Sequence, residues 1–103
     1  MVVNQGEIWW LETETGKARP VLVVTRDEAI PVLQRVLVAP VTRTQRAARS
    51  QLPVGRAEGL PVESVCNFDD LAVVPKSLLA RRLGTLGPRR HELCATLRAM
   101  ADC

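Results

Sequence analysis

Arginine and threonine side chains stand at the ends of two apolar segments of this sequence. Arg19 and Pro20 come directly before the aliphatic run VLVV, and Thr42 closes the apolar segment 35–42. If the two segments pair as antiparallel strands, the start of one lies beside the end of the other, and Arg19 and Thr42 share one rim. A forked guanidinium and a hydroxyl suit a phosphate group. The pattern therefore indicates a phosphate-binding rim; the alternative is that these strand ends are polar only because they are exposed.

Basic and polar side chains continue beyond Thr42. The segment TRTQRAARS, residues 42–50, lacks large apolar groups and predicts an exposed loop. Only two of the 14 basic residues are lysine, and arginine is the better partner for phosphates and for stacking on bases, although a GC-rich genome explains the excess of arginine equally well. Phosphate-contacting candidates in this loop and in the preceding hairpin loop are Lys17, Arg43, Thr44, Gln45, Arg46 and Arg49.

Other kinds of catalytic chemistry find little support. His91 is the one histidine, and the three cysteines form no CxxC pair, so the sequence predicts no metal site and no cofactor. Cys66 lies in an apolar segment and is predicted to be a buried, unreactive thiol. Glycine-rich phosphate loops of the GxxxxGK[ST] or GxGxxG type are absent from the sequence.

Length and composition limit the class of protein. The 103 residues are 47% hydrophobic, which predicts one globular domain spanning 1–103. The net charge of +3 and the pI of about 9.1 fit a polyanionic partner. No apolar stretch approaches the ~20 residues of a membrane span, and the first ten residues do not resemble a signal peptide. These features predict a cytoplasmic protein with reduced thiols.

Short strands and turns dominate the pattern that must position the candidate residues. Alternating and continuous apolar runs predict strands at 6–12, 18–26 and 35–42, the first two joined by a hairpin turn at Gly16. The segment 18–26 is apolar on both faces and so central. A connection without a long helix follows, then a short strand at 50–56 and one or two at 64–75. The segment 75–86 predicts a helical turn and then a last short strand. With a helix at 87–103, this predicts a mainly β fold, a small bent antiparallel barrel.

Several residues carry more specific expectations. Pro40 is expected at a bulge or at the exposed rim of its strand, because it cannot donate to a ladder. Arg89 and Arg90 lie at the helix end that favours anions, which indicates an anionic group nearby. An apolar stripe on that helix is formed by Leu93, Leu97 and Met100 and widened by Cys94 and Ala101. Cys94, Leu97 and Met100 are expected to pack on the barrel; the alternative is that part of the helix meets a second subunit. For Trp9 and Trp10 two interpretations are open. The favoured one is a place in the core or in a dimer interface; the other is that one of them stacks on a base.

The chain resembles the MazF/PemK (Kid-like) family of type II toxin-antitoxin endoribonuclease toxins. The resemblance covers nearly the whole chain and rests on an ordered set of segments: GEIWWLE, KARPVLVVTR, VLVAPVTRTQR, SVCNFDDLAVVPKSLL and a terminal leucine-rich helix. It implies a small SH3-like barrel of the MazF/CcdB toxin type that forms a homodimer. The first loop, TETGKARP, is shorter than in many relatives, so base specificity is not carried over.

The resemblance also implies an activity. Relatives of this kind are mRNA interferases, which cleave single-stranded RNA at short motifs without a metal and so inhibit translation and growth. The products are a 2′,3′-cyclic phosphate and a 5′-hydroxyl; the target is messenger RNA or, alternatively, transfer or ribosomal RNA. A cognate MazE-like antitoxin blocks the RNA groove. The family's catalytic arginine falls on Arg19 and its catalytic threonine on Thr42.

The proton acceptor for such a reaction stays open at this point. Because a guanidinium remains protonated, Arg19 is expected to act as an electrostatic clamp on the phosphate. Water, or a carboxylate from Glu12, Glu14 or Asp27, is left to take the proton. Two other functions also remain open: a CcdB-like gyrase inhibitor without nuclease activity, and an RNA-binding module without catalysis.

Overall fold

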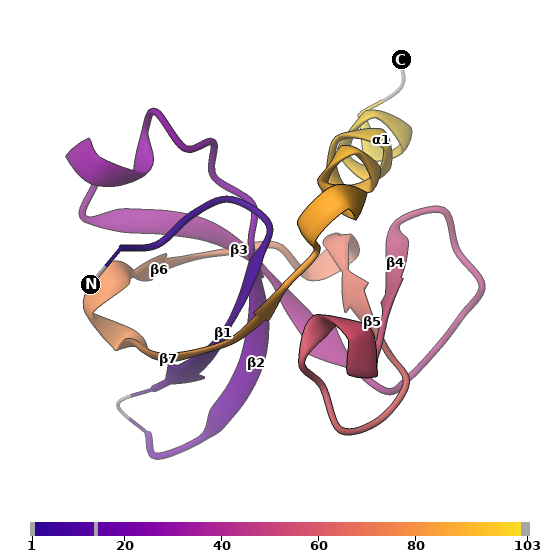
Figure 1. The fold of residues 1–103 in the computed structure, drawn as a ribbon, viewed down its shortest axis with the longest axis horizontal. Coiled ribbons are helices and arrows are strands. Elements are labelled where there is room, and N and C mark those ends of the chain that lie inside the picture. Colours follow the sequence, from indigo (N-terminus) through magenta and orange to yellow (C-terminus); the bar gives the residue numbers. More distant parts are fainter. Residues whose placement is uncertain (1, 14, 102–103) are drawn as a thin grey trace.

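A curled antiparallel sheet and one C-terminal helix make up the computed structural model, which describes residues 2–13 and 15–101 (Figure 1). The elements are β1 Glu7–Glu12, β2 Ala18–Val23, β3 Arg35–Thr42, β4 Gln51–Val54, β5 Ser64–Asn67, β6 Ala72–Pro75, β7 Leu79–Thr85 and α1 Arg90–Met100. Single 3-10 turns lie at 30–32, 56–58, 68–70, 76–78 and 87–89. The strand order is β4-β5-β3-β2-β1-β7, and β6 pairs with the first half of β3. The predicted mainly β barrel is confirmed as a partly closed barrel.

The hairpin of β1 and β2 lies in the middle of the sheet. Gly16 turns the chain with a φ of +80°, a conformation that favours glycine. Ile8 and Leu22 pack into one apolar cluster, whereas Trp9 and Val21 pack into a second cluster on the opposite face. Burial on both faces explains the continuous apolar run of β2. The predictions of a hairpin and of a central second strand are confirmed.

Strand β3 changes its neighbour halfway along. It pairs with β6 from Arg35 to Val38 and with β5 from Val41, while Pro40 pairs with Val21 of β2 on the other side. Pro40 is buried, and the register between β2 and β3 shows no shift. The expectation of a bulge or an exposed rim at Pro40 is therefore wrong. Proline is tolerated in this interior position because it lies between the end of one ladder and the start of the next.

The terminal helix contacts the barrel through a narrower face than its sequence predicted. Helix α1 lies beside β4 and the 68–70 turn, and Leu93 is fully buried there (Figure 1). Cys94 is exposed and Met100 is 40% exposed, so the expectation that they pack on the barrel is wrong. Thr96 is buried instead, and its hydroxyl donates to the Glu92 carbonyl at 2.8 Å. A threonine that bonds back to its own helix can be buried without an unpaired polar group.

Trp9, rather than Trp10, enters the core. Trp9 is buried and its indole Nε1 donates to Glu7 Oε1 at 3.0 Å, while Trp10 is half-buried. A buried indole needs an acceptor for its N–H, and Glu7 supplies it. The favoured core interpretation therefore holds for Trp9.

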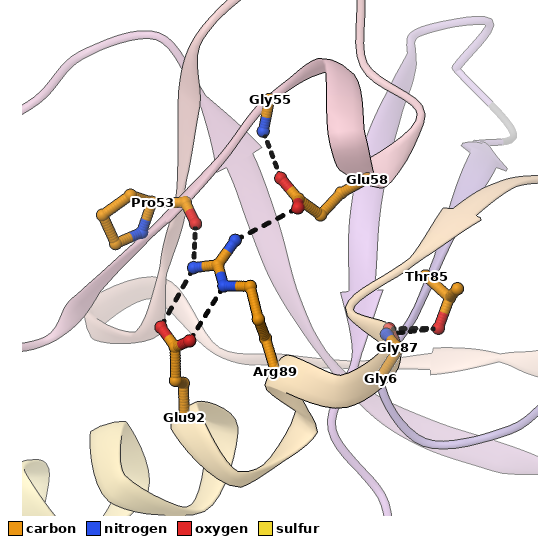
Figure 2. A network of polar contacts seen from close by, with 8 residues as sticks. All are labelled: Gly6, Pro53, Gly55, Glu58, Thr85, Gly87, Arg89 and Glu92. Carbon is orange, nitrogen blue, oxygen red and sulfur yellow. Dashed lines mark hydrogen bonds and ion pairs between the residues drawn. The ribbon is translucent and has the colours of Figure 1, made fainter.

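Arg89 joins the helix to two distant parts of the chain (Figure 2). Its guanidinium donates to both carboxylate oxygens of Glu92, at 2.8 and 3.0 Å, and to the Pro53 carbonyl at 2.8 Å. It also forms an ion pair of 3.2 Å with Glu58, whose side chain is only 7% exposed. The hydrogen bonds with Glu92 raise the pKa of Arg89 and lower the pKa of Glu92. The expected anionic group near this helix end is thus a pair of carboxylates.

Candidate active site

Arg19 and Thr42 line one pocket of about 130 Å³, on the side of the barrel where β3 passes from β6 to β5. Val21 pairs with Pro40, so extending this antiparallel register by two residues sets Arg19 opposite Thr42. Strand β2 therefore positions the guanidinium and the end of β3 positions the hydroxyl. The pocket is lined by Arg19, Pro40, Thr42, Thr44, Arg46, Gln51, Asn67 and Asp70.

The predicted binding residues divide into two groups. Thr44 and Arg46 line the pocket, whereas the others are exposed and lie outside its lining. That second group consists of Lys17, Arg43, Gln45 and Arg49. The loop after β3 therefore contributes both to the pocket wall and to the open surface around it.

Thr42 is held in a way that leaves its hydroxyl hydrogen available. Its Oγ1 accepts a hydrogen bond from the Thr44 amide at 3.2 Å. A hydroxyl can accept and donate at the same time, so Thr42 can still donate to a ligand in the pocket. The local turn after β3 thus fixes the oxygen without consuming its donor.

The sequence did not predict a role for Gln51, although its side chain holds the loop that carries Thr44 and Arg46. Its side chain is 8% exposed; Oε1 accepts from the Arg46 amide at 2.7 Å and Nε2 donates to the Thr44 carbonyl at 3.2 Å. The chain turns between Arg46 and Gln51, where Ala47 adopts a positive φ of 52°. The only sign of this role in the sequence was a polar residue at the start of a short strand. The pairing of that strand with β5 could not be predicted.

The sequence also did not predict that Asn67 and Asp70 line the pocket. Asn67 ends β5, pairs with Gln51 and is buried. Its Nδ2 donates to Asp70 Oδ2 at 2.9 Å, and its Oδ1 accepts from the Asp69 amide at 3.2 Å, which caps the 68–70 turn. The run NFDD directly after an apolar strand was the signal for a polar strand end. The turn after β5 brings the Asp70 carboxylate to the pocket that Arg19 and Thr42 line.

The arginines of the pocket lack carboxylate partners within the described part of the chain. Elsewhere, Arg26 forms an ion pair with Glu28, Arg82 with Glu7, and Arg90 with Asp27. Arg89 pairs with both Glu58 and Glu92. Arg19 and Arg46 form none among the residues described. Two unneutralised guanidinium groups beside a hydroxyl donor make this pocket suited to an anion, with phosphate geometry favoured by the arginine fork.

Other chemistry-bearing side chains lie away from this pocket. Asp27 is engaged by Arg90 at 3.0 Å and by the Gln5 amide at 2.7 Å. Glu12 does not line the pocket, and Glu14 is outside the described residues. His91 is exposed near the start of α1. Glu12 and Asp27, two of the proton acceptors named from the sequence, are thus not among the described side chains that line the pocket.

Cys66 is fully buried, and burial raises the pKa of its thiol to about 12. A raised pKa disfavours the thiolate, and the prediction that Cys66 is buried is confirmed. Among the residues that the structure describes, no three histidine, cysteine or acidic side chains gather as a metal-binding group. The same residues include no helix long and apolar enough to cross a bilayer.

Comparison with known proteins places this arrangement in a family. Residues 4–100 match the family described as PemK-like, MazF-like toxin of type II toxin-antitoxin system. The chain belongs to this family. The MazF-like chain is 40% identical to the probable endoribonuclease MazF2 of Mycobacterium tuberculosis, over 98% of this chain and all of that protein.

Solved structures agree with the family assignment. The MazF-like chain superimposes on the Mycobacterium tuberculosis toxin MazF-mt6 with a TM-score of 0.82 and 33% identity, covering 93% of this chain and 96% of that one. A mycobacterial endoribonuclease solved in complex with its cognate antitoxin has a TM-score of 0.83, with 98% of this chain and 96% of that chain covered. At 18% identity, that second likeness concerns the fold alone.

Proposed function

We propose that this MazF-like toxin is a sequence-specific, metal-independent endoribonuclease that cleaves single-stranded RNA and so inhibits translation and growth. The observation that carries the proposal is the pocket in which Arg19 and Thr42 meet, with Arg19 and Arg46 left without carboxylate partners among the described residues. The name of MazF2, a probable endoribonuclease, supports the same activity.

The chemistry needs only what such a pocket offers. In RNA, the 2′-hydroxyl attacks the adjacent phosphorus and expels the 5′-oxygen, leaving a 2′,3′-cyclic phosphate and a 5′-hydroxyl. Negative charge builds on the non-bridging oxygens as the bond forms. Arg19 holds these oxygens, and Thr42 donates its hydroxyl to the same group. Preorganised donors of this kind stabilise the transition state more than the ground state.

RNA binding extends from the pocket along the loop after β3. Thr44 and Arg46 contact the phosphate next to the cleaved one, and the exposed side chains outside the pocket meet the flanking backbone. Those flanking residues are Lys17, Arg43, Gln45 and Arg49. The substrate class is messenger RNA or another RNA with accessible single-stranded segments, such as transfer or ribosomal RNA.

Protein partners follow from the same proposal. The toxin forms a homodimer, acts in the cytoplasm, and is neutralised by a cognate MazE-like antitoxin that covers the RNA-binding groove. A mycobacterial endoribonuclease of the same fold has been solved with its cognate antitoxin, which supports the antitoxin part of the proposal.

A CcdB-like gyrase inhibitor is the less favoured alternative. Inhibition of a protein target does not need a guanidinium and a hydroxyl converging on one small polar pocket, and MazF2 is named a probable endoribonuclease. Purified protein that leaves gyrase supercoiling unchanged while cutting RNA would exclude it.

The test is cleavage of a long single-stranded RNA in EDTA, with the new ends mapped and identified. Wild-type protein should give discrete cuts with cyclic phosphate ends. Arg19→Ala should lower the rate about 100- to 1,000-fold, because one transition-state donor is removed. Arg19→Lys keeps the charge but not the fork and should stay strongly impaired.

Two results would contradict the proposal. Intact RNA after incubation with folded wild-type protein would remove the nuclease activity altogether. Full activity of Arg19→Lys would remove the bidentate clamp while leaving the nuclease.

A further inference from the structure

A single carboxylate, that of Asp70, belongs to the described lining of the pocket that holds Arg19 and Thr42. Cleavage by the 2′-hydroxyl requires a group that takes its proton, and a guanidinium does not serve because it stays protonated. Of the other carboxylates named from the sequence, Asp27 is engaged by Arg90 and Glu12 lies outside the lining, while Glu14 is not among the described residues. The position of Asp70 therefore matters for the reaction.

The Asp70 carboxylate is oriented but not consumed. Its Oδ2 accepts a hydrogen bond from Asn67 Nδ2 at 2.9 Å, and Asn67 is buried and anchored in turn by the Asp69 amide. Its Oδ1 has no partner within the described part of the chain. One oxygen is thus fixed by a buried amide, while the other remains able to accept a proton.

Arg19 and Arg46 share the pocket with Asp70 but form no ion pair with it. A carboxylate whose role is to neutralise an arginine lies in direct contact with it, as Glu92 does with Arg89 at 2.8 Å. The separation instead leaves space for a ligand between the cations and the anion. A ribose 3′-phosphate fits this polarity, with its phosphate toward Arg19 and its 2′-hydroxyl toward Asp70.

We propose that Asp70, oriented by Asn67, is the general base that accepts the 2′-hydroxyl proton, an inference that rests on the proposed cleavage of RNA. The O2′–H bond breaks and its proton passes to Asp70 Oδ1 as the O2′ electron pair forms the bond to phosphorus. The bond from phosphorus to the 5′-oxygen breaks, and its electron pair stays on that oxygen, which takes a proton from water. The resulting hydroxide removes the proton from Asp70 and restores the carboxylate.

Asp70→Asn tests this role with little change in shape. Its side-chain oxygen still accepts from Asn67, but it no longer takes up a proton. The cleavage rate at one mapped site should fall about 100- to 10,000-fold, the range that general acid–base catalysis contributes. Affinity should be kept, measured with an oligonucleotide of the mapped site that carries a 2′-deoxyribose at the cleaved position.

Asp69→Asn is the matched control. Asp69 is the neighbouring acid, it accepts from the Ser50 hydroxyl at 2.6 Å, and it does not line the pocket. The same change of charge one residue away should leave the cleavage rate close to that of the wild type. Equal losses in both variants would overturn the assignment, because they would show a general effect of charge.

Chemical rescue separates a base from a structural residue. Asp70→Ala should recover part of its missing rate when formate is added, because a free carboxylate replaces the deleted one, whereas Arg19→Ala should not recover. A wild-type rate in Asp70→Asn, or an Asp70→Ala protein that formate leaves inactive, would overturn the proposal. A wild-type protein that does not cut the RNA would instead refute the underlying nuclease function, so the two failures are distinguishable.

Discussion

Thr42 stands at the end of β3 with its oxygen fixed by the Thr44 amide and its hydroxyl hydrogen free to donate. Thr42→Val keeps the branched shape but removes the hydroxyl, so it should lower the cleavage rate about 100-fold by removing one donor to the transition state. Thr42→Ser keeps the hydroxyl and should retain most of the activity. Rates are measured at saturating RNA, so that a change in chemistry is separated from a change in binding.

An equal loss in both variants would count against this role. It would indicate that the methyl group of Thr42, and not its hydroxyl, is what the pocket requires. Unchanged activity in Thr42→Val would remove Thr42 from the reaction altogether.

At the residue level, the sequence predicted the positions that depend on one strand pairing. Arg19 and Thr42 could be placed together because both flank obvious apolar strands and antiparallel pairing sets their ends side by side. Gln51, Asn67 and Asp70 could not, because their place depends on the pairing of β5 with both β3 and β4. Short strands interrupted by proline and glycine carry too little periodicity to predict such a pairing.

Arg89 links three elements, since it connects α1 to the 56–58 turn and to β4 (Figure 2). Arg89→Ala leaves the Glu58 carboxylate, 7% exposed, without its cation. Breaking a fully buried pair in this way costs ~3–5 kcal/mol. Because the Arg89 side chain is 32% exposed, we expect a lower cost in the free energy of unfolding, about 2 kcal/mol. Urea unfolding followed by circular dichroism measures it.

Arg98→Ala is the control on the same helix, because Arg98 is exposed and forms no ion pair among the described residues. Its effect should stay within about 0.5 kcal/mol. The double variant Glu58→Gln with Arg89→Ala should recover part of the stability, because the buried carboxylate is then neutral. No recovery would mean that the missing packing of Arg89, and not the orphaned charge, is responsible.

At the level of helices and strands, the sequence was sufficient to predict an element where a single residue determined the local backbone. Gly16 marked the first hairpin and Pro31 excluded a long helix before β3. The stripe on α1 was predicted too wide, because its periodicity gives the apolar residues but not how closely the helix approaches the sheet. The last short strand predicted within 75–86 is β7, Leu79–Thr85, which pairs with β1 along Glu7 to Leu11 with two shifts of register.

For the molecule as a whole, the basic side chains gathered in the loop after β3 predict how RNA binding responds to salt. Arg46→Ala should make the plot of log affinity against log salt concentration shallower by about 0.7 for each phosphate that is no longer neutralised, the value for single strands. Fluorescence anisotropy of an uncleavable RNA at several salt concentrations measures the slope.

Arg26→Ala removes the same charge from a different place. Arg26 is exposed and forms an ion pair with Glu28 at 3.9 Å, away from the pocket lining. This variant should leave the slope unchanged. An equal change in both variants would show that net charge alone, rather than the loop after β3, governs RNA binding.

The passage of β3 from one neighbour to another has a consequence for timing. The pocket draws on β2, the end of β3, the start of β4 and the turn after β5, so it spans positions 19 to 70 of the chain. Pairings between such distant segments form late, because the chain must first close long loops. A nascent chain therefore lacks a complete pocket while its first strands are being synthesised. It becomes a toxin only once most of its length has been synthesised and folded.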